Sequence, residues 1–368
     1  MKMTRRKKVI FLTNTMTAGG AERVMSNMAN YLSIEKSNDF EILLLTTAVT
    51  EDFYEISNQV RREYLDKAQT KTPLILKPFK FILRWWRLKR LINVEKPDCV
   101  VSFLENVNLL NTLGCLGTST NSIISMRNDP RKNNIGPLLS AMRRLVYPLA
   151  DKLVVQTNSV LEWCKARSLN SRTIVVPNSV KIPEVSWVQN TEANTPFKFI
   201  AAGRLVPQKG FDLLIEAASL IKSRDVSMSI DIYGKGSLAH ELQQKIEALN
   251  LEKAVHLKGL TENLQDKLLE ADAFVLSSRY EGFPNVLLEA LALGVPSVSF
   301  DCKSGPSDII DHGVDGLLVD DGSVEALAEA MEKVIKDRSL SLRMGDNAKK
   351  NMLRYEISSI MTMWCSIF

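Results

Sequence analysis

The sequence contains few histidines and cysteines, and their spacing fits neither a metal site nor a disulfide framework. Among 368 residues there are three histidines and five cysteines, an odd number without close pairs. Zinc sites need closely spaced Cys and His ligands, and disulfide-bonded secreted domains need paired cysteines. These absences argue against both classes and favour a reducing cytoplasm. The residues are His240, His256 and His312, with Cys99, Cys115, Cys164, Cys302 and Cys365.

Long apolar runs are also absent. No run reaches the roughly 18 residues that a membrane-spanning helix requires. At 368 residues the chain exceeds the usual size of a single hydrophobic core, so two domains are expected. Hydrophobic residues at 45% and charged residues at 24% are ordinary for a globular protein. Composition therefore predicts a cytoplasmic, two-domain globular protein.

A dinucleotide-binding G-x-G-x-x-G pattern is missing as well. The first glycine turn instead contains Gly19 and Gly20, which follow the strand-like run at residues 9–12. Adjacent glycines allow the backbone to approach a bound ligand closely. We therefore expect Gly19 and Gly20 to contact a ligand without forming a dinucleotide fingerprint.

Short apolar runs alternate with helical segments in both halves, which is the pattern of parallel sheets covered by helices. A polar stretch with prolines separates the halves, and it predicts a linker at residues 181–196 between domains at 1–180 and 197–349. The predicted strands are 9–12, 42–46, 99–103, 122–125 and 152–156 in the first half, and 197–202, 229–233, 255–258, 273–276, 297–300 and 316–319 in the second.

Two glutamates eight positions apart, Glu281 and Glu289, lie in an informative run. A short apolar strand precedes Glu281, and Gly282 and Pro284 then form a turn before a helix that reaches Leu293. Glu281 is thus predicted at the carboxyl end of a strand, where open α/β sheets bind ligands. Backbone N–H groups at a helix start can bind phosphate or sugar oxygens, and carboxylates can bind hydroxyl pairs. The run therefore favours a sugar nucleotide as the ligand.

A simpler interpretation is that Glu289 faces solvent and that Glu281 only caps the turn, since charged residues are mostly exposed. The neighbours argue against it, because the helix around Glu289 is apolar on nearly all sides. A carboxylate in a largely buried segment needs a partner. We therefore treat both glutamates as candidate ligand-binding residues.

A second strand–glycine–helix run places Arg204 and Lys209 after the strand at 197–202. Such a pair of cations is often only a solvated loop. Here it follows Gly203 at a strand end, which favours binding. An arginine offers a planar fork and a lysine a mobile point charge, so together they suit the two phosphates of a nucleoside diphosphate.

In order and spacing, these motifs resemble the large family of retaining GT-B glycosyltransferases with an E-x7-E motif. The resemblance covers residues 197 to 350, roughly the second half of the chain. In the first half, Gly19 through Arg23 is similar to the opening of the branch that builds bacterial polysaccharides and lipid-linked oligosaccharides. The matching segments are Gly203-Arg204, Lys209-Gly210, Tyr233-Gly234-Lys235-Gly236, Leu257-Lys258-Gly259, Glu281 through Glu289, Gly294-Val295-Pro296, Ser304-Gly305-Pro306 and Gly313 through Val319.

This resemblance implies a GT-B fold, in which two Rossmann-like domains face each other across a cleft. It also implies that a C-terminal helix, residues 350–368, packs on the first domain. Catalytic roles fall to Glu281, which positions the donor sugar, and to Arg204 and Lys209, which neutralise the departing diphosphate. Glu289 would hold the ribose hydroxyls. The remaining expected donor contacts are Gly203, Gly282, Phe283, Asn285, Gly19 and Gly20.

Acceptor-side candidates come from the first half. Arg127 and Asn128 follow the predicted strand at 122–125, and Asp129 before Pro130 is as readily a turn residue. Many relatives carry a histidine near this point, and this chain departs from them, so no histidine of the first domain can act as a base. Glu105 and Asn108, after the strand at 99–103, are weaker candidates. The complete set of acceptor-side candidates is Glu105, Asn108, Arg127 and Asn128.

Charge is divided unevenly along the chain. Residues 1–180 contain 27 Lys and Arg against 15 Asp and Glu, a net of +12, whereas the remainder has 20 against 27, a net of −7. The basic half should therefore face something negative. The clearest patch, Lys77–Arg90, has cations on one helical face and aromatic residues on another, which favours an anionic membrane surface. It is equally compatible with an ordinary surface helix packed on the core, and both can hold together.

The predicted function is a retaining transferase that moves a hexose or N-acetylhexosamine from a nucleotide sugar, by family habit UDP-linked, to a lipid-linked saccharide. Capsule or lipopolysaccharide synthesis at the inner face of the membrane is the expected setting. No Asp-x-Asp triplet occurs, so we expect no metal ion and no other cofactor. The alternatives are a GT-B nucleotide-sugar epimerase and a non-enzymatic, basic nucleic-acid-binding protein. The basic half lacks a nucleic-acid-binding motif, so no nucleic-acid partner is expected.

Overall fold

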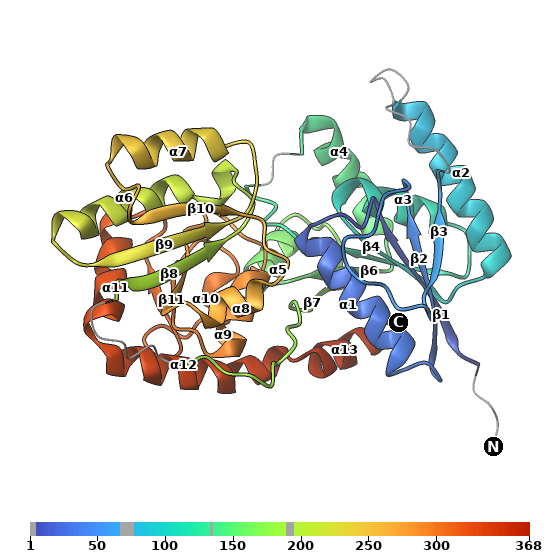
Figure 1. Ribbon diagram of the computed structural model, residues 1–368. Coiled ribbons are helices and arrows are strands. Elements are labelled where there is room, and N and C mark those ends of the chain that lie inside the picture. The colour runs from blue at the N-terminus through green and yellow to red at the C-terminus, as the bar shows by residue number, and fades with distance from the viewer. Residues whose placement is uncertain (1–4, 67–76, 133–134, 189–194) are drawn as a thin grey trace. The chain divides into compact units, whose positions relative to one another are not determined.

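The computed structural model of the chain describes residues 5–66, 77–132, 135–188 and 195–368 (Figure 1). The chain forms two compact units. The first unit comprises Met1–Asn178 and Ile360–Phe368, and the second comprises Ser179–Ser359. The chain thus leaves the first unit close to residue 180, where the boundary was predicted. It returns at Ile360, later than the predicted residue 350.

A parallel sheet of seven strands forms the centre of the first unit. Its order is β3-β2-β1-β4-β5-β6-β7, so the direction of winding reverses between β1 and β4. The central strands consist mostly of buried residues, as expected when helices cover both faces of a sheet. The strands are β1 Lys7–Thr13, β2 Phe40–Thr46, β3 Arg61–Tyr64, β4 Cys99–Phe103, β5 Asn121–Ser125, β6 Lys152–Val155 and β7 Thr173–Val175.

Both edge strands of this sheet, β3 and β7, were missed by the sequence prediction. β3 reads Arg-Arg-Glu-Tyr and has no buried residue, and β7 has only three residues. Edge strands are often short and charged because these properties protect an open edge from pairing with other chains. An apolar run is the signal that identifies a buried strand; β3 lacks it, and β7 is too short for its Ile174 and Val175 to give a clear one.

Helices cover both faces of the first sheet. Leu88 of α2 and Leu110 of α3 pack with Ile10 of β1 on one face. Phe11 belongs to the opposite face, where Phe368 packs edge-on against it with ring centroids 6.4 Å apart. The helices of this unit are α1 Gly20–Ile34, α2 Lys77–Glu95, α3 Glu105–Cys115, α4 Pro137–Val146, the 3-10 turn η2 Tyr147–Leu149, and α5 Asn158–Lys165.

The last residues of the chain complete the core of the first unit. Trp364, in α13 (Ile357–Cys365), is fully buried. Its ring centroid lies 6.2 Å from that of Phe103 at the end of β4, and 5.9 Å from that of Phe368. These contacts join residues from opposite ends of the sequence in one hydrophobic core.

The second unit has a parallel sheet of six strands in the order β10-β9-β8-β11-β12-β13, and winding reverses between β8 and β11. All six predicted strands are present. Because the strands are parallel, their carboxyl ends lie at one edge of the sheet. The strands are β8 Phe197–Ala202, β9 Met228–Tyr233, β10 Val255–Gly259, β11 Ala273–Leu276, β12 Ser297–Phe300 and β13 Leu317–Val319.

Figure 1 shows α6 and α7 on one face of this sheet and α8 and α9 on the other. Leu214 of α6 and Leu327 of α11 join Phe199 of β8 in one buried cluster. The helices are η3 Pro207–Lys209, α6 Phe211–Ser223, α7 Ala239–Ala248, α8 Leu264–Leu269, α9 Asn285–Leu293, α10 Pro306–Ile309, α11 Val324–Lys336, α12 Arg338–Met352 and η4 Leu353–Tyr355.

Part of the predicted linker packs on the second unit. The Trp187 backbone N–H donates to the Leu293 carbonyl at 2.8 Å, and its indole Nε1–H donates to the Ala271 carbonyl at 2.7 Å. Val180 forms a β-bridge with Glu356. Residues 189–194 of the predicted linker lie outside the described residues. The described part is therefore an ordered covering of the second unit.

Candidate active site

Lys209 and Glu281 form a buried ion pair at the reversal point of the second sheet. Lys209 Nζ lies 2.6 Å from Glu281 Oε1, and the two side chains are 14% and 8% exposed. Lys209 belongs to the loop after β8, whereas Glu281 belongs to the loop after β11. These two strands are neighbours in the sheet although they are far apart in the sequence. The pair thus lies where parallel α/β sheets bind ligands.

Serines after β11 connect the two loops and orient the carboxylate. The Ser278 hydroxyl donates to Glu281 Oε1 at 2.7 Å. The Ser277 hydroxyl donates to the Lys209 carbonyl at 3.0 Å. Glu281 is therefore held by a cation and a hydroxyl in a buried setting, where such contacts restrict its rotamer. The sequence prediction missed both serines, because a serine at a strand end carries no specific signal.

Gly210 allows the two loops to meet. Its φ angle is +61°, in the left-handed region. A Cβ atom added here would lie 2.0 Å from the Ser277 carbonyl oxygen, which is far inside van der Waals contact. Glycine is required on both grounds. This close approach brings Lys209 within reach of Glu281.

Arg204 is the exposed cation of the site. It follows β8 and Gly203, and it makes no side-chain hydrogen bond or ion pair with the described residues. Gly203 packs against the Lys209 side chain, since an added Cβ would lie 3.1 Å from Lys209 Cδ. The loop after β8 therefore presents one anchored cation and one accessible cation.

The turn and helix after Glu281 follow the predicted arrangement. α9 begins at Asn285, and Glu289 is half-buried on it. Phe283 is buried, and its ring packs edge-on against Tyr355 with centroids 5.4 Å apart. The Gly282 carbonyl accepts a hydrogen bond from the Ser304 hydroxyl at 3.2 Å, which supports this turn from the loop after β12. The site therefore gathers residues that follow three neighbouring strands, β8, β11 and β12.

Within the first unit, Gly19 lies in the turn between β1 and α1, and Gly20 is the first residue of α1. Gly19 is the N-terminal cap of α1 and has an extended backbone, with φ −160°. A Cβ added to Gly19 would lie 2.2 Å from a carboxylate oxygen of Glu22. The turn follows β1, at the reversal point of the first sheet.

Glu105 opens α3 after β4, on the other side of that reversal point. Its carboxylate accepts a hydrogen bond from the Tyr147 hydroxyl and another from Arg143 Nη1 at 3.4 Å. Asn108 is fully buried and donates to the Ser125 carbonyl at 2.9 Å. Both predicted candidates are thus tied into the polar interior of their own unit.

Arg127 is buried and its guanidinium is enclosed by aromatic rings. It lies 3.7 Å from the Phe103 ring centroid and 5.6 Å from that of Trp364. Nη1 donates to Asn178 Oδ1 at 2.9 Å, whereas Nε and Nη2 find no partner among the described residues. Burial lowers the pKa of Arg127 to about 9, which leaves it charged at neutral pH. Asn128, in contrast, is exposed.

Asp129 forms the turn that was one of its two expected roles. Its Oδ1 accepts hydrogen bonds from the backbone N–H and from Nε of Arg131, at 2.9 and 2.7 Å. The residue is 1% exposed. A carboxylate so placed fixes the loop that contains Asn128.

The basic face of α2 is directed at one carboxylate. Lys80, Arg84 and Arg87 lie 3.3, 2.8 and 2.9 Å from the buried Asp66 carboxylate. A second face packs in the core through residues such as Trp85. A third face exposes large apolar side chains, since Phe79, Ile82 and Trp86 are 67%, 58% and 52% exposed. Among the described residues, no helix is long and apolar enough to cross a membrane.

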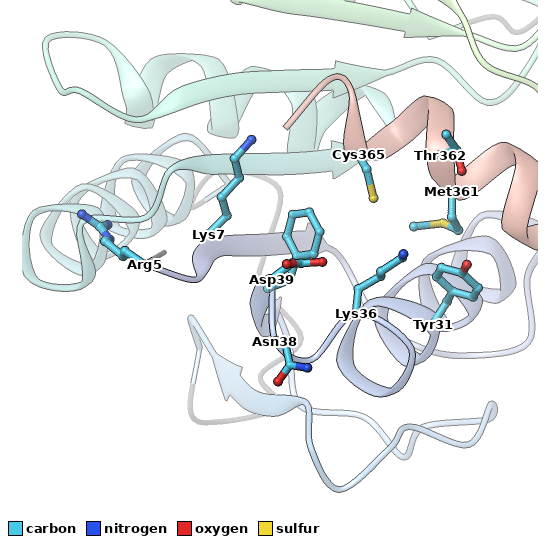
Figure 2. Close-up of a pocket in the computed structure, with 10 residues that line it drawn as sticks. Arg5, Lys7, Tyr31, Lys36, Asn38, Asp39, Met361, Thr362 and Cys365 are labelled. Carbon is cyan, nitrogen blue, oxygen red and sulfur yellow. The ribbon is translucent and has the colours of Figure 1, made fainter. Parts of the chain in front are cut away.

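A separate pocket of about 410 Å³ lies at the amino ends of β1 and β2 (Figure 2). It is therefore at the sheet edge opposite to the predicted ligand-binding residues. α13 and the segment between α1 and β2 supply much of its wall, and Figure 2 shows Lys36, Tyr31 and Met361 around it. Within the described chain, no cluster of His, Cys, Asp and Glu side chains could hold a metal ion. That the enzyme needs no metal ion remains a prediction.

The second half of the chain matches a known family. Residues 186–351 match the family described as Glycosyl transferases group 1. The GalNAc-alpha-(1->4)-GalNAc-alpha-(1->3)-diNAcBac-PP-undecaprenol alpha-1,4-N-acetyl-D-galactosaminyltransferase of Campylobacter jejuni is 29% identical over 98% of both chains. The amylovoran biosynthesis glycosyltransferase AmsD of Erwinia amylovora is 25% identical over 98% of this chain and 99% of its own.

Solved structures share the fold over the whole chain. The crystal structure of Anabaena HepE in complex with UDP has a TM-score of 0.77 at 16% sequence identity, and covers 98% of this chain and 99% of that one. Two parallel-sheet α/β units with this similarity are the GT-B fold. Residues 186–351 thus match the Glycosyl transferases group 1 family, and the chain, which has the GT-B fold, is similar to bacterial polysaccharide glycosyltransferases.

Proposed function

We propose that the chain is a retaining glycosyltransferase that moves a hexose or N-acetylhexosamine from a nucleotide sugar to a lipid-linked saccharide. The observation that carries this proposal is the Lys209–Glu281 pair at the reversal point of the second sheet, beside the exposed Arg204. A carboxylate and two cations at this position match the hydroxyls and the diphosphate of a sugar nucleotide.

Lys209 and Arg204 act on the leaving group. As the bond between the sugar C1 and the phosphate oxygen breaks, negative charge grows on the diphosphate. Arg204 is exposed and can close on that charge, while Lys209 is already fixed by Glu281. Fixed cations stabilise developing charge without reorganising during the reaction. These two side chains therefore lower the barrier for departure of the nucleoside diphosphate.

Glu281 positions the donor sugar, and Glu289 on α9 holds the ribose hydroxyls. Retention follows from attack of the acceptor hydroxyl on the same face that the phosphate leaves. The new bond joins the acceptor oxygen to C1, and the hydroxyl proton passes to the departing phosphate oxygen. This route needs no nucleophile from Glu281, whose Oε1 is engaged by Lys209 and Ser278.

The donor and acceptor classes are inferred from relatives and charge. The Campylobacter relative is named for a diphospho-undecaprenol saccharide, and HepE was crystallised with UDP. We therefore propose a UDP-sugar donor and a lipid-linked acceptor. The net positive charge of the first half and the exposed aromatic side chains of α2 support attachment of the enzyme to an anionic membrane surface.

The decisive experiment measures nucleoside diphosphate released from UDP-, GDP- and ADP-sugars, with and without a lipid-linked acceptor fraction. We expect release from one donor that the acceptor stimulates, and a product whose anomeric configuration matches the donor. The variant Glu281→Gln serves as a catalytic control. If the acceptor does not change the release of nucleoside diphosphate, the protein is an epimerase or a hydrolase. A product of inverted anomeric configuration would exclude a retaining mechanism.

A further inference from the structure

An ion pair between Arg279 and Asp212 joins the two loops that carry Lys209 and Glu281. Arg279 Nη1 and Nη2 donate to the two carboxylate oxygens of Asp212 at 2.7 and 2.6 Å. Arg279 lies in the loop after β11, and Asp212 lies in the first turn of α6, which follows the loop after β8. Two parallel hydrogen bonds between a guanidinium and a carboxylate fix the orientation of both groups. The pair therefore connects the two loops in addition to the Lys209–Glu281 contact.

The guanidinium of Arg279 is committed to this pair and to the protein around it. Burial disfavours the charged form of Asp212, but the hydrogen bonds from Arg279 outweigh it and lower the pKa of the carboxyl group below its ordinary value. The pair is therefore charged at neutral pH. Arg204, in contrast, makes no side-chain hydrogen bond or ion pair in the described part of the chain. Arg279 is thus not equivalent to Arg204 as a cation for a diphosphate.

Arg279 also holds the 3-10 turn η3 through its carbonyl groups. Its Nη1 donates to the Pro207 carbonyl at 2.9 Å, and its backbone N–H donates to the Gln208 carbonyl at 2.9 Å. The Ser277 hydroxyl donates to the third carbonyl, that of Lys209. Each of the three residues of η3 thus accepts a hydrogen bond from the loop after β11, and Arg279 supplies two of these bonds. Because a short 3-10 turn has few hydrogen bonds of its own, the bonds from Arg279 determine where it lies.

The position of η3 determines where the Lys209 ammonium group lies. Lys209 is the last residue of η3, and Gly210 follows it with a φ angle of +61°. A glycine leaves the backbone free to adopt other angles, so it permits this turn without fixing it. The Lys209 side chain is a flexible four-carbon stem, and its Nζ moves with the backbone that carries it. A displacement of about 1 Å at a site of reaction can lower the rate about a hundredfold.

We propose that Arg279 is a positioning residue, which fixes η3 through its carbonyl groups and Asp212 and so holds the Lys209 ammonium group ready for the diphosphate of the donor. Arg279 itself touches neither the phosphates nor the sugar in this role. The inference rests on the proposed function, because it assigns Arg279 to the same reaction.

Steady-state release of nucleoside diphosphate by Arg279→Met tests the proposal. We expect kcat to fall by about tenfold and KM for the donor to change by less than about twofold, because charge grows on the leaving group in the transition state. Arg279→Lys keeps the charge without the planar fork and should recover part of this loss. Arg224→Met is the matched control, since Arg224 pairs with Glu332 at 2.6 Å and is 41% exposed, against 38% for Arg279, but lies at the other end of α6. Its kcat should equal that of the original chain.

The double variant Lys209→Met/Arg279→Met shows whether Arg279 acts through Lys209. If it does, adding Arg279→Met to Lys209→Met should lower turnover by less than about a further twofold, because the group to be positioned is already absent. A further loss of about tenfold would assign Arg279 a substrate contact of its own and overturn the proposal. A normal kcat in Arg279→Met would also overturn it.

Hydrogen–deuterium exchange gives a measurement that does not depend on activity. The backbone N–H groups of Lys209 and Gly210 donate to the Val206 and Pro207 carbonyls at 3.0 and 3.3 Å. In Arg279→Met they should exchange at least about tenfold faster than in the original chain or in Arg224→Met. Unchanged exchange would overturn the proposal even if kcat falls.

The two measurements separate this proposal from the proposed function. If the original chain releases no nucleoside diphosphate from any donor, the proposed function fails, and the exchange rates alone decide whether Arg279 holds η3. Circular dichroism establishes that each variant is folded. If Arg279→Met does not fold, Arg279→Lys takes its place in every comparison, with smaller changes expected in the same directions.

Discussion

Arg127 and Arg204 stand at the same distance from a strand end in their own units and have opposite environments. Each is the second residue after a central strand of a parallel sheet. Arg204 is exposed and without a partner in the described chain, whereas Arg127 is 9% exposed between two aromatic rings. The position of an arginine after a strand therefore does not determine its role. Residues distant in the sequence determine whether its side chain is buried or exposed.

The difference arises from what covers each strand end. Trp364 and Asn178, from the end of the chain and the end of the first unit, enclose Arg127. In the second unit, the loop after β11 reaches Lys209 and leaves Arg204 open. An enclosed cation such as Arg127 is held by its aromatic neighbours and is closed to a substrate, whereas an accessible cation such as Arg204 can meet one.

The variant Lys209→Met should give the largest effect. It leaves the Glu281 carboxylate buried without its cation, so unfolding free energy should fall by about 3 kcal/mol and turnover by more than about a hundredfold. Adding Glu281→Gln should restore most of the stability but not the turnover, because no buried charge then remains. Urea unfolding and release of nucleoside diphosphate measure the two quantities. Recovery of turnover in the double variant would contradict the catalytic assignment.

Arg204→Ala should separate activity from stability. We expect turnover to fall by more than about tenfold, which corresponds to about 1.4 kcal/mol in the barrier. Unfolding free energy should change by less than about 0.5 kcal/mol, since the side chain is exposed. Lys235→Ala, which removes a different exposed cation after a strand of this sheet, is the matched control and should have a smaller kinetic effect. Equal turnover in all three proteins would remove Arg204 from the site.

Arg127→Met should show the reverse pattern. It removes the cation–π contacts and the hydrogen bond to Asn178 while keeping a long apolar side chain, so unfolding free energy should fall by about 2 kcal/mol. Turnover should fall less than in Arg204→Ala. Urea unfolding and release of nucleoside diphosphate measure the two effects. A stable variant with a raised KM for the acceptor would favour the predicted acceptor role of Arg127 over a structural one.

The smallest effect is expected from an ion pair of the first unit away from both reversal points. Hydrogen bonds from Arg61 and Lys8 lower the pKa of Glu95 from 4.5 to about 2. A lowered carboxyl pKa stabilises the fold above pH 4.5, and this contribution is lost as the pH falls toward 2. Glu95→Gln should cost about 1 kcal/mol at neutral pH, because Arg61 is partly solvated, and nothing near pH 2. Urea unfolding across this range checks it, and a change in turnover would contradict it.

Much of the fold could be predicted from the sequence, because buried strands and helix ends leave local signals. The turn from Glu281 through Asn285 and the glycine turn at Gly203 were predicted where the structure has them. Gly210 also has the positive φ that a glycine in such a turn suggests. The edge strands escaped prediction, because β3 has no apolar run and β7 has only three residues.

Long-range partners of the site could not be predicted. Nothing in the run around Lys209 indicates that Ser277 binds its carbonyl, because strand neighbours are set by sheet order instead of by sequence distance. The basic face of α2 was recognised by its spacing, yet its common partner Asp66 was not. An ion pair depends on register and on loop path, and single-sequence periodicity reports neither.

The packing of Trp364 against Phe103 bears on how the protein is made. A ribosome that has released residues 1–178 has supplied every strand of the first sheet but not the tryptophan that fills its core. The first unit therefore cannot finish folding before the second has been synthesised. Although amino-terminal domains usually fold first during translation, here all residues of the second unit, which are contiguous, are synthesised before those that complete the first. Premature termination near residue 360 would thus damage the half of the protein that was translated first.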